Sequence, residues 1–173
     1  MARNSVYSPL RRALVLIIVG LALLAMVPSA SHATSTEVRD GWAVLGSPYS
    51  FENLVKRVEF AASDHGIGIV TRASATIGAK RALDVDIPGN MVMGLFHPRF
   101  AVRMLAASIS AGIEAPIRLY LTENDDGTTT LSYKIPSHVF APYMDEGGAE
   151  LGTLANELDE LFSSLTGQAV GTN

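Results

Sequence analysis

The stretch "IRLYLTENDDGTTTLSYKI", residues 117–135, decides the fold, because it holds two alternating runs around a strong turn signal. Apolar or aromatic residues recur at every second position on one face of each run: Ile117, Leu119 and Leu121, then Leu131, Tyr133 and Ile135. Arg118, Tyr120 and Thr122 fall on the opposite face of the first run. This period of two predicts a pair of half-buried strands. "NDDG" between them is typical of a hairpin, so the pair is expected to be antiparallel.

The residues before this hairpin predict alternating helices and strands. "MVMGLF", residues 91–96, is a continuous apolar run of strand length, which favours a central strand covered on both faces. "GIVTR", residues 68–72, lies within a second short segment that is expected to be a buried strand from Ile67 to Arg72. Apolar residues at helical spacing follow Ser47 and Pro48 and stop at "DHG", where Gly66 suits a left-handed helix end. A brief helix after Ser74 and a longer one ending near Leu165 complete the pattern.

The order of these elements, roughly β-α-β-α-β-α-β-β-α, predicts the α+β fold class. We expect one two-layer domain over residues 47–166, with a small mixed sheet of 4–5 strands and helices packed on it. Residues 34–46 form an N-terminal segment with a candidate first strand near Trp42 and Val44, and residues 167–173 are expected to be loose. A right-handed crossover between 91–96 and 117–123 would make those two strands parallel.

Residues 1–33 have the three-part layout of a cleaved signal peptide. Arg11 and Arg12 precede the apolar run "ALVLIIVGLALLAMV", and "PSASHA" places Ser31 and Ala33 at small-residue cleavage positions. The run is shorter than the roughly 18 residues typical of a membrane-spanning helix, although an uncleaved anchor is the alternative. We therefore expect a periplasmic or secreted protein, cleaved near Ala33/Thr34, without stable membrane insertion afterwards.

Composition disfavours several classes of partner. The chain has 13 Lys and Arg against 17 Asp and Glu, and three of the arginines lie in the predicted leader, so the mature domain is expected to carry 10 against 17. An acidic domain without a basic run is a poor candidate for nucleic-acid binding, which depends on phosphate neutralisation. The absence of cysteine excludes disulfides, thiolate metal sites and a cysteine nucleophile.

Five short segments, in this order and spacing, resemble a known family. They are "HGIGIV", "MVMGLFHP", "AGIEAPIRLYL", "ENDDGTTTLSY" and "YKIP". Over about residues 48–145 they are similar to the domain of unknown function numbered 302, an uncharacterised bacterial α+β domain. The resemblance implies a compact fold, frequent export and frequent dimers, and no established chemistry. Two positions depart from the family pattern: His97 stands where the family has Asn, and Ile135 where it usually has Asp.

The segment "GLFHPRF", residues 94–100, is the best candidate site in the sequence. Pro98 at the first helical position makes His97 the N-cap, so the turn from strand to helix is expected to expose backbone N–H groups and the positive end of the helix dipole. Arg99 and Arg103 would add positive charge. We predict a site for a small anionic ligand formed by His97, Arg99 and Arg103, with Tyr133 as a further candidate residue. The alternative is that His97 only caps the helix, and that Tyr133 only packs in the core or a dimer contact.

No catalytic, metal or cofactor site is predicted. His65, His97 and His138 lie far apart in the sequence, and the parallel crossover would place His97 and His138 at opposite ends of the sheet. There is no G-x-S-x-G motif. The leading hypothesis is thus non-enzymatic binding of a small anion or a partner protein by a homodimer. The alternatives are a small hydrolase or isomerase that uses His97 as general base, and a purely structural dimer module.

Overall fold

The computed structural model describes residues 36–172; the predicted signal peptide, residues 1–33, lies outside the described residues. Within the described part the strands form one five-stranded sheet in the order β1-β5-β4-β3-β2, and every neighbouring pair is antiparallel. The strands are β1 (Trp42–Ser47), β2 (Gly68–Ala73), β3 (Asn90–Phe96), β4 (Ile117–Glu123) and β5 (Thr129–Lys134). The α+β class is confirmed, and the expected mixed sheet is wrong.

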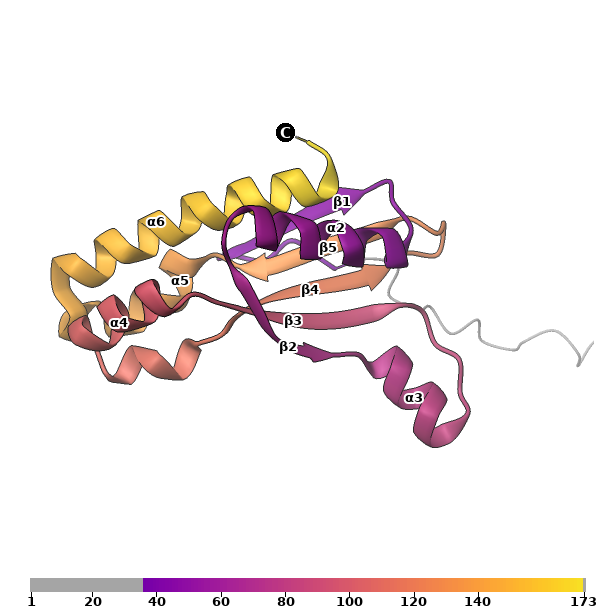
Figure 1. The fold of residues 1–173 in the computed structure, drawn as a ribbon, viewed down its shortest axis with the longest axis horizontal. Helices are drawn as coiled ribbons and strands as arrows, with labels where there is room; N and C mark the ends of the chain where they lie inside the picture. The colour runs from indigo at the N-terminus through magenta and orange to yellow at the C-terminus, as the bar shows by residue number, and fades with distance from the viewer. Residues whose placement is uncertain (1–35, 173) are drawn as a thin grey trace, which may run out of the picture. The chain divides into compact units, whose positions relative to one another are not determined.

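Helices occupy the connections between the strands (Figure 1). The α-helices are α2 (Phe51–Asp64), α3 (Ala75–Leu83), α4 (Pro98–Ala107), α5 (Pro136–Phe140) and α6 (Met144–Val170). Two short 3-10 helices, η1 (Ser110–Glu114) and η2 (Ala141–Tyr143), follow α4 and α5. Within residues 36–172, no helix is long and apolar enough to cross a membrane.

The connection between β3 and β4 explains why these strands are antiparallel. A parallel crossover needs a connection that runs back along the length of the sheet, and the segment between β3 and β4 does not do this. The ten-residue α4 packs instead against α6 and η1, and the chain enters β4 at the end where it left β3, since Leu95 faces Ile117. This return makes β3 and β4 antiparallel, and the other three neighbouring pairs are antiparallel as well.

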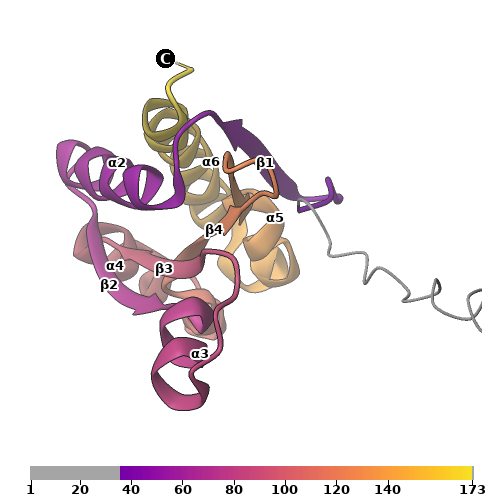
Figure 2. The same cartoon turned by 90° about the vertical axis from the view of Figure 1, so that its right-hand side faces the viewer.

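The core lies between one face of the sheet and the helices α2 and α6, which lie on the same side of the sheet in both views (Figures 1 and 2). Leu54, Val58 and Ala61 of α2 are fully buried against it. The sheet contributes Met93, Leu119, Leu121 and Leu131, and α6 contributes Leu151, Leu154, Ala155 and Leu165, all completely buried. Burial of each such leucine contributes about 1.5–3 kcal/mol, so this single interface supplies most of the stability of the fold.

Two strands differ from expectation because the sheet is covered on one face. β3 is second from the edge rather than central, and its side chains alternate: Met91, Met93 and Leu95 are buried, whereas Val92 is half-buried. β2 forms an edge and is largely exposed. The predictions that β3 is doubly covered and that β2 is buried are therefore wrong, because no helix among the described residues packs over the second face. We call this second face the open face.

The C-terminal residues 167–170, expected to be loose, are the last turn of α6. The Arg57 guanidinium holds them, since Nε donates to the carbonyl oxygen of Ala169 at 2.6 Å and Nη2 to that of Gln168 at 2.8 Å. The same guanidinium lies over the Tyr49 ring, 4.1 Å from its centroid. Ala169 and Val170 are accordingly buried.

Helix α3 projects from the edge of the sheet beside β2 and β3 (Figures 1 and 2). Its predicted cap is confirmed, because the Ser74 hydroxyl accepts a hydrogen bond from the Ile77 amide at 3.2 Å. None of its residues is buried, and Leu83 is 71% exposed. Its position is fixed from the sheet side, where Thr76 Oγ1 donates to the Pro88 carbonyl and accepts from the Asn90 amide.

Two helical leucines test where the stability resides. Leu154→Ala, at a fully buried position of α6, is expected to lower the free energy of unfolding by about 2–5 kcal/mol because it leaves a cavity. Leu83→Ala on α3 is the matched control and should change it by no more than about 0.5 kcal/mol. Urea denaturation followed by circular dichroism measures both; equal effects would contradict the assignment of the core.

Candidate functional site

The strand-to-helix corner at His97 is a closed helix cap. His97 has extended backbone angles, and its Nδ1 accepts a hydrogen bond from the Arg99 amide at 3.0 Å. The amides of Phe100 and Ala101 both donate to the His97 carbonyl oxygen at 3.1 Å, and Pro98 has no amide hydrogen. The first turn of α4 therefore offers no free amide to a ligand, and the prediction of exposed N–H groups at this corner is wrong.

The two arginines beside the corner have different surroundings. Arg103 binds two carboxylates of α6: Nη1 lies 2.6 Å from Glu157 Oε2, and Nη2 lies 2.9 Å from Glu150 Oε1. These contacts raise the pKa of Arg103, and the hydrogen bond from Arg103 lowers the pKa of Glu157. Arg99 is exposed, with its guanidinium over the Phe100 ring, 5.4 Å from the centroid. Of the two predicted cations, only Arg99 is left without an ion pair among the described residues.

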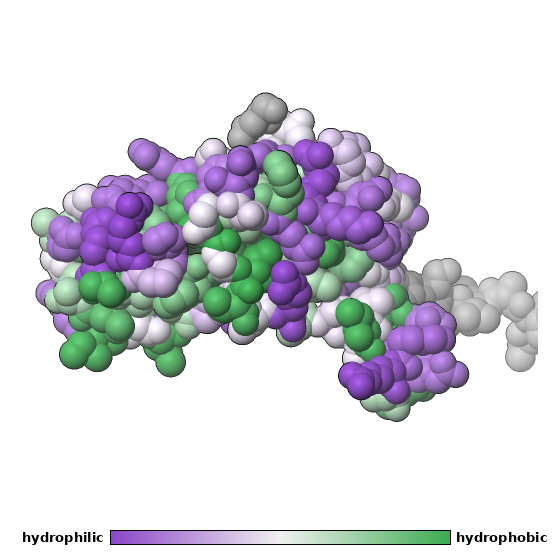
Figure 3. All heavy atoms as spheres, in the orientation of Figure 1, coloured by the Kyte–Doolittle hydropathy of each residue, from purple (hydrophilic) through white to green (hydrophobic). Residues whose placement is uncertain are grey.

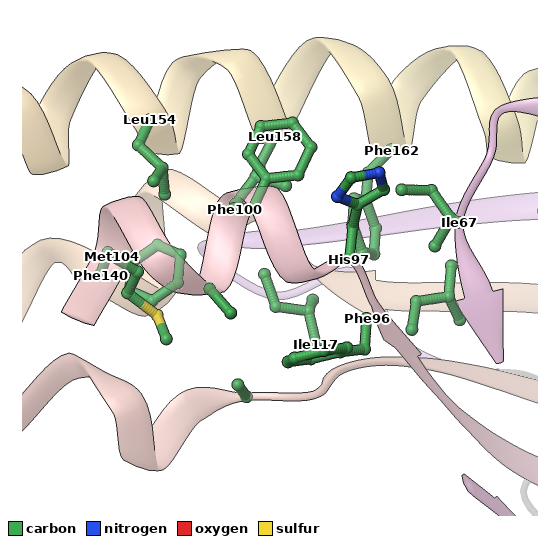
Figure 4. A pocket seen from close by; sticks show the side chains of 13 residues that line it. Ile67, Phe96, His97, Phe100, Met104, Ile117, Phe140, Leu154, Leu158 and Phe162 are labelled. Atoms are coloured by element: carbon green, nitrogen blue, oxygen red, sulfur yellow. The ribbon is translucent and has the colours of Figure 1, made fainter. Parts of the chain in front are cut away.

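Behind the corner lies a narrow apolar slot of about 40 Å³ (Figure 4). Its lining comes from β3, α4 and α6 among other elements and includes Phe100, Met104, Leu158 and Phe162. His97 contributes the one polar side chain among the thirteen residues of this lining. Small-molecule sites usually measure about 300–1,000 Å³, so this slot is too small for an organic ligand.

The arrangement around His97 also lacks the partner that a general base needs. Within residues 36–172, no carboxylate hydrogen bonds to the imidazole, whose one hydrogen-bond partner there is the Arg99 amide. The ring instead makes an edge contact with Phe100, with centroids 5.6 Å apart. A catalytic histidine is normally oriented by an acid or a carbonyl group, and neither orients His97 in the described part of the chain.

The predicted opposition of His97 and His138 is wrong. Because β3 and β5 are both antiparallel to β4, they run in the same direction, and the residues that follow them lie at the same end of the sheet. Even so, no group of three or more His, Cys, Asp or Glu side chains in the described region is placed to hold a metal ion.

Tyr133 lies apart from the other predicted site residues, on the face of β5 that is turned toward the core. It is 6% exposed, and its ring centroid lies 5.6 Å from that of Phe162. Burial raises the pKa of its phenol, while a hydrogen bond with Thr166 opposes this shift. Tyr133 also lines a second and larger cavity, which lies against the open face of the sheet.

This second cavity, the open-face groove, has a volume of about 290 Å³. It is lined by strand residues, with one residue each from η1 and α5 at one end: Trp42, Val92, Glu114, Ile117, Arg118, Tyr120, Ser132, Tyr133, Lys134 and Val139. Its volume lies close to the lower limit for small-molecule sites. A cavity of about 380 Å³ beside Lys56 and Arg57 is larger, but the open-face groove combines charged and aromatic side chains in one lining, which makes it the candidate site.

The sheet register brings the polar residues of the groove together. Trp42 lies opposite Lys134, and Tyr120 lies opposite both Ser132 and Val92. The β4–β5 register, in which Leu119 faces Tyr133, also sets Arg118 across from Lys134. Side chains directly opposite one another have Cβ atoms about 4.5–5.5 Å apart, so Arg118 and Lys134 are adjacent cations at one end of the groove.

Neither cation has a carboxylate at ion-pair distance in the described region. Among residues 36–172, Arg118 and Lys134 form no ion pair, although both are exposed at the groove. The carboxylate that lines the groove, Glu114, accepts a hydrogen bond from the Tyr143 hydroxyl at 2.8 Å. Two like charges placed opposite one another on a sheet destabilise it, so this pair is unfavourable for folding unless an anion binds it.

The sequence contained part of this site. The alternation in residues 117–135 already places Arg118 and Tyr120 on the outer face, and the same period places Ser132 and Lys134 there. The sequence could not reveal that β1 pairs with β5. This pairing brings Trp42 beside Lys134, which lies far from it along the chain. The groove was missed because the sequence pattern did not show that this face lacks a covering helix.

The cap at His97 can be tested by substitution. His97→Ala is expected to lower the free energy of unfolding by about 1 kcal/mol, because the Arg99 amide loses its acceptor. His97→Asn should retain most of the stability, since asparagine is a favoured N-cap. Urea denaturation distinguishes the two variants; an alanine variant as stable as the asparagine variant would contradict the capping role.

Comparison with known proteins agrees with the fold. The family model described as "Domain of unknown function DUF302" matches residues 44–165. A search of curated proteins found no match. The solved structure of an uncharacterised conserved DUF302 protein from Bacillus stearothermophilus is similar, with a TM-score of 0.66 and 16% identity over 76% of this chain and 99% of that chain. At this identity the structural likeness concerns the fold alone, whereas the family match covers most of the chain and confirms the resemblance drawn from the sequence. The chain belongs to the DUF302 family.

Proposed function

We propose that this protein is an exported, non-enzymatic binding module that holds a small anionic ligand in the open-face groove. The observation that carries the proposal is the adjacent pair Arg118 and Lys134, which has no ion-pair partner among the described residues and lies in a cavity of about 290 Å³. Export is proposed from the sequence of residues 1–33, which have the layout of a signal peptide.

The charges favour an anion. The chain carries a formal net charge of −4, so a pair of free cations in a groove is a local exception to the charge of the molecule. An arginine binds a carboxylate or phosphate through two parallel hydrogen bonds, and a neighbouring lysine adds a point charge. A bound anion would also remove the repulsion between Arg118 and Lys134, so binding and stability would be coupled.

The groove suits this role better than the corner at His97, where the sequence had suggested it. At the corner the first-turn amides are already bonded, Arg103 is held by Glu150 and Glu157, and the adjoining slot measures about 40 Å³. Arg99 would be the remaining cation. At the groove two cations and a larger cavity coincide.

The residues that line the groove favour binding over catalysis. Nucleophilic catalysis needs a nucleophile in contact with a base. Here the Ser132 hydroxyl donates to the Tyr120 carbonyl oxygen at 3.5 Å, and no histidine is among the lining residues. The competing hypothesis, a hydrolase or isomerase with His97 as general base, would place the chemistry at the corner.

The test uses Trp42, which is the single tryptophan of the chain and lines the groove. Titration with acetate, benzoate and inorganic phosphate should change its fluorescence and raise the melting temperature for at least one of them. Arg118→Gln/Lys134→Gln should abolish both effects and should melt no lower than the unliganded parent, because a repulsive pair is removed. This melting temperature shows that the variant is folded.

The matched control is His97→Asn/Arg99→Gln, which alters the corner and leaves the groove intact. It should bind the same anion as the parent does. Loss of binding in this control, or binding that persists in the Arg118/Lys134 variant, would contradict the assignment of the groove and would favour the corner.

A second candidate function, a structural dimer module, is favoured by an exposed apolar stripe on α4 and η1. Its members are Val102 (69% exposed), Leu105 (47%), Ile109 (79%) and Ile113 (78%). The two helices meet within the stripe, because a Cβ on Gly112 of η1 would lie 2.9 Å from Leu105 Cδ2 of α4. Figure 3 shows apolar surface gathered at this end of the molecule. Apolar patches of this kind often mark protein interfaces.

A second copy of the chain is the occupant we propose for this stripe. Two stripes related by a twofold axis would join apolar surface to apolar surface. Glu114 and Glu146 lie beside the stripe, since Glu146 contacts the Ser110 amide, and these acids disfavour an anionic lipid surface. Glu114 also lines the open-face groove, so the proposed dimer contact adjoins one end of the groove.

Analytical ultracentrifugation tests the dimer. The mature chain is expected to sediment at twice its own mass, and Ile109→Asp/Ile113→Asp should sediment as a monomer, because charges would be buried in the contact. Ile77→Asp on α3, also at an exposed apolar position, is the control and should remain dimeric. A monomeric parent would contradict the dimer, and a dimeric stripe variant would contradict this interface.

A further inference from the structure

We infer that the ligand of the open-face groove is a small aromatic monocarboxylate, an inference that rests on the proposed function. The combination of two adjacent cations with aromatic and apolar side chains in one small groove points to this chemical class. Arg118 and Lys134 would bind the carboxylate, and Tyr120, Val92 and Trp42 would contact the ring.

The lining of the groove is mainly apolar. Six of its ten residues are aromatic or aliphatic. The side chains of Trp42, Val92 and Tyr120 lie on the open face and Val139 comes from α5, whereas Ile117 and Tyr133 line the groove from core-facing positions. Such a lining stabilises the body of a ligand by removing apolar surface from water. An inorganic anion has no apolar surface and would leave these contacts unused, so the lining favours an organic anion.

The register places the aromatic side chains beside the cations. Trp42 and Lys134 are direct neighbours across β1 and β5, and Tyr120 is two residues along β4 from Arg118. Residues two apart on one strand face are separated by about 6.8 Å, and diagonal neighbours by about 7–8 Å. These separations match a ring that lies over Tyr120 and Val92 and carries its carboxylate directly, or through a short link, toward Arg118 and Lys134.

The charge and the backbone of the groove favour an organic carboxylate over phosphate. Arg118 and Lys134 contribute two positive charges, the Glu114 carboxylate in the same lining contributes one negative charge, and the Arg39 guanidinium lies over the Trp42 ring, 5.8 Å from its centroid. Phosphate sites usually combine cations with several free backbone amides at a helix N-terminus or a nest. Here the amides of β4 and β5 are paired with one another in the sheet, and no helix begins among the lining residues.

Four probes test the inference by isothermal titration calorimetry on the mature chain. Benzoate has the ring and the charge, benzamide has the ring without the charge, acetate has the charge without the ring, and inorganic phosphate is a different anion. We expect benzoate to bind at least tenfold more tightly than each of the others. Arg118→Gln/Lys134→Gln should reduce benzoate binding at least tenfold, consistent with the loss of a charged hydrogen-bonded pair.

A substitution of Tyr120, in the wall of the groove, separates the contribution of the ring contact to binding from that of the charge. Tyr120→Ala is expected to weaken benzoate binding by about threefold to tenfold, because the aromatic contact is lost, and to leave acetate binding unchanged. Val102→Ala, at an exposed position outside the groove, is the control and should leave benzoate binding unchanged. The melting temperature of each variant establishes that it is folded.

The outcomes distinguish this inference from the proposed function. If acetate or phosphate binds as tightly as benzoate, and binding still requires Arg118 and Lys134, the proposed function holds and the inference of an aromatic ligand is overturned. If benzoate binds but Tyr120→Ala has no effect, the inference is likewise overturned. If none of the probes binds at millimolar concentration, or if binding does not require Arg118 and Lys134, both the proposed function and the inference of an aromatic ligand are overturned.

Discussion

The packing of α2 and α6 against a single face of the sheet determines the rest of this structure. Leu54 and Val58 of α2, together with Leu154 and Leu165 of α6, are fully buried against that face. The connection through α4 packs against α6 and η1 and returns the chain to the same end of the sheet, so β3 and β4 are antiparallel. No described helix packs over the opposite face. The outward side chains of the sheet are therefore available for binding.

How well the sequence predicts a feature depends on how far apart in the chain the interacting residues lie. The hairpin of β4 and β5, the Ser74 cap and the helix end at Gly66, which has a φ of 68°, depend on neighbouring residues and were predicted. The direction of β3 relative to β4 and the pairing of β1 with β5 depend on which space the helices leave free. No local pattern contains that information.

The run at residues 91–96 illustrates the same limit. A continuous apolar run predicted a strand covered on both faces, yet Val92 is a half-buried wall of the open-face groove. At Gly94 the open face has no room for a side chain, because a Cβ there would overlap Thr71 Oγ1 and the Pro116 ring. The apolar character of this strand thus reflects a groove wall and a close contact rather than a second layer of helices.

The contrast between the corner and the groove shows why local chemistry was a poor guide to the site. A histidine before a proline and two arginines suggested an anion site, but these groups are largely satisfied within the protein, by the Arg99 amide and by Glu150 and Glu157. Arg118 and Lys134 belong to no conspicuous motif, yet they are adjacent and have no ion-pair partner in the described region. Unsatisfied groups, rather than conspicuous motifs, indicate where a bound ligand would contribute most to stability.

The most direct measurement is a ¹H–¹⁵N NMR titration of the mature chain with benzoate. The account predicts shift changes at the Trp42 indole and at the amides of 118–120 and 132–134, while those of 97–103 stay unchanged. Changes confined to 97–103 would contradict it.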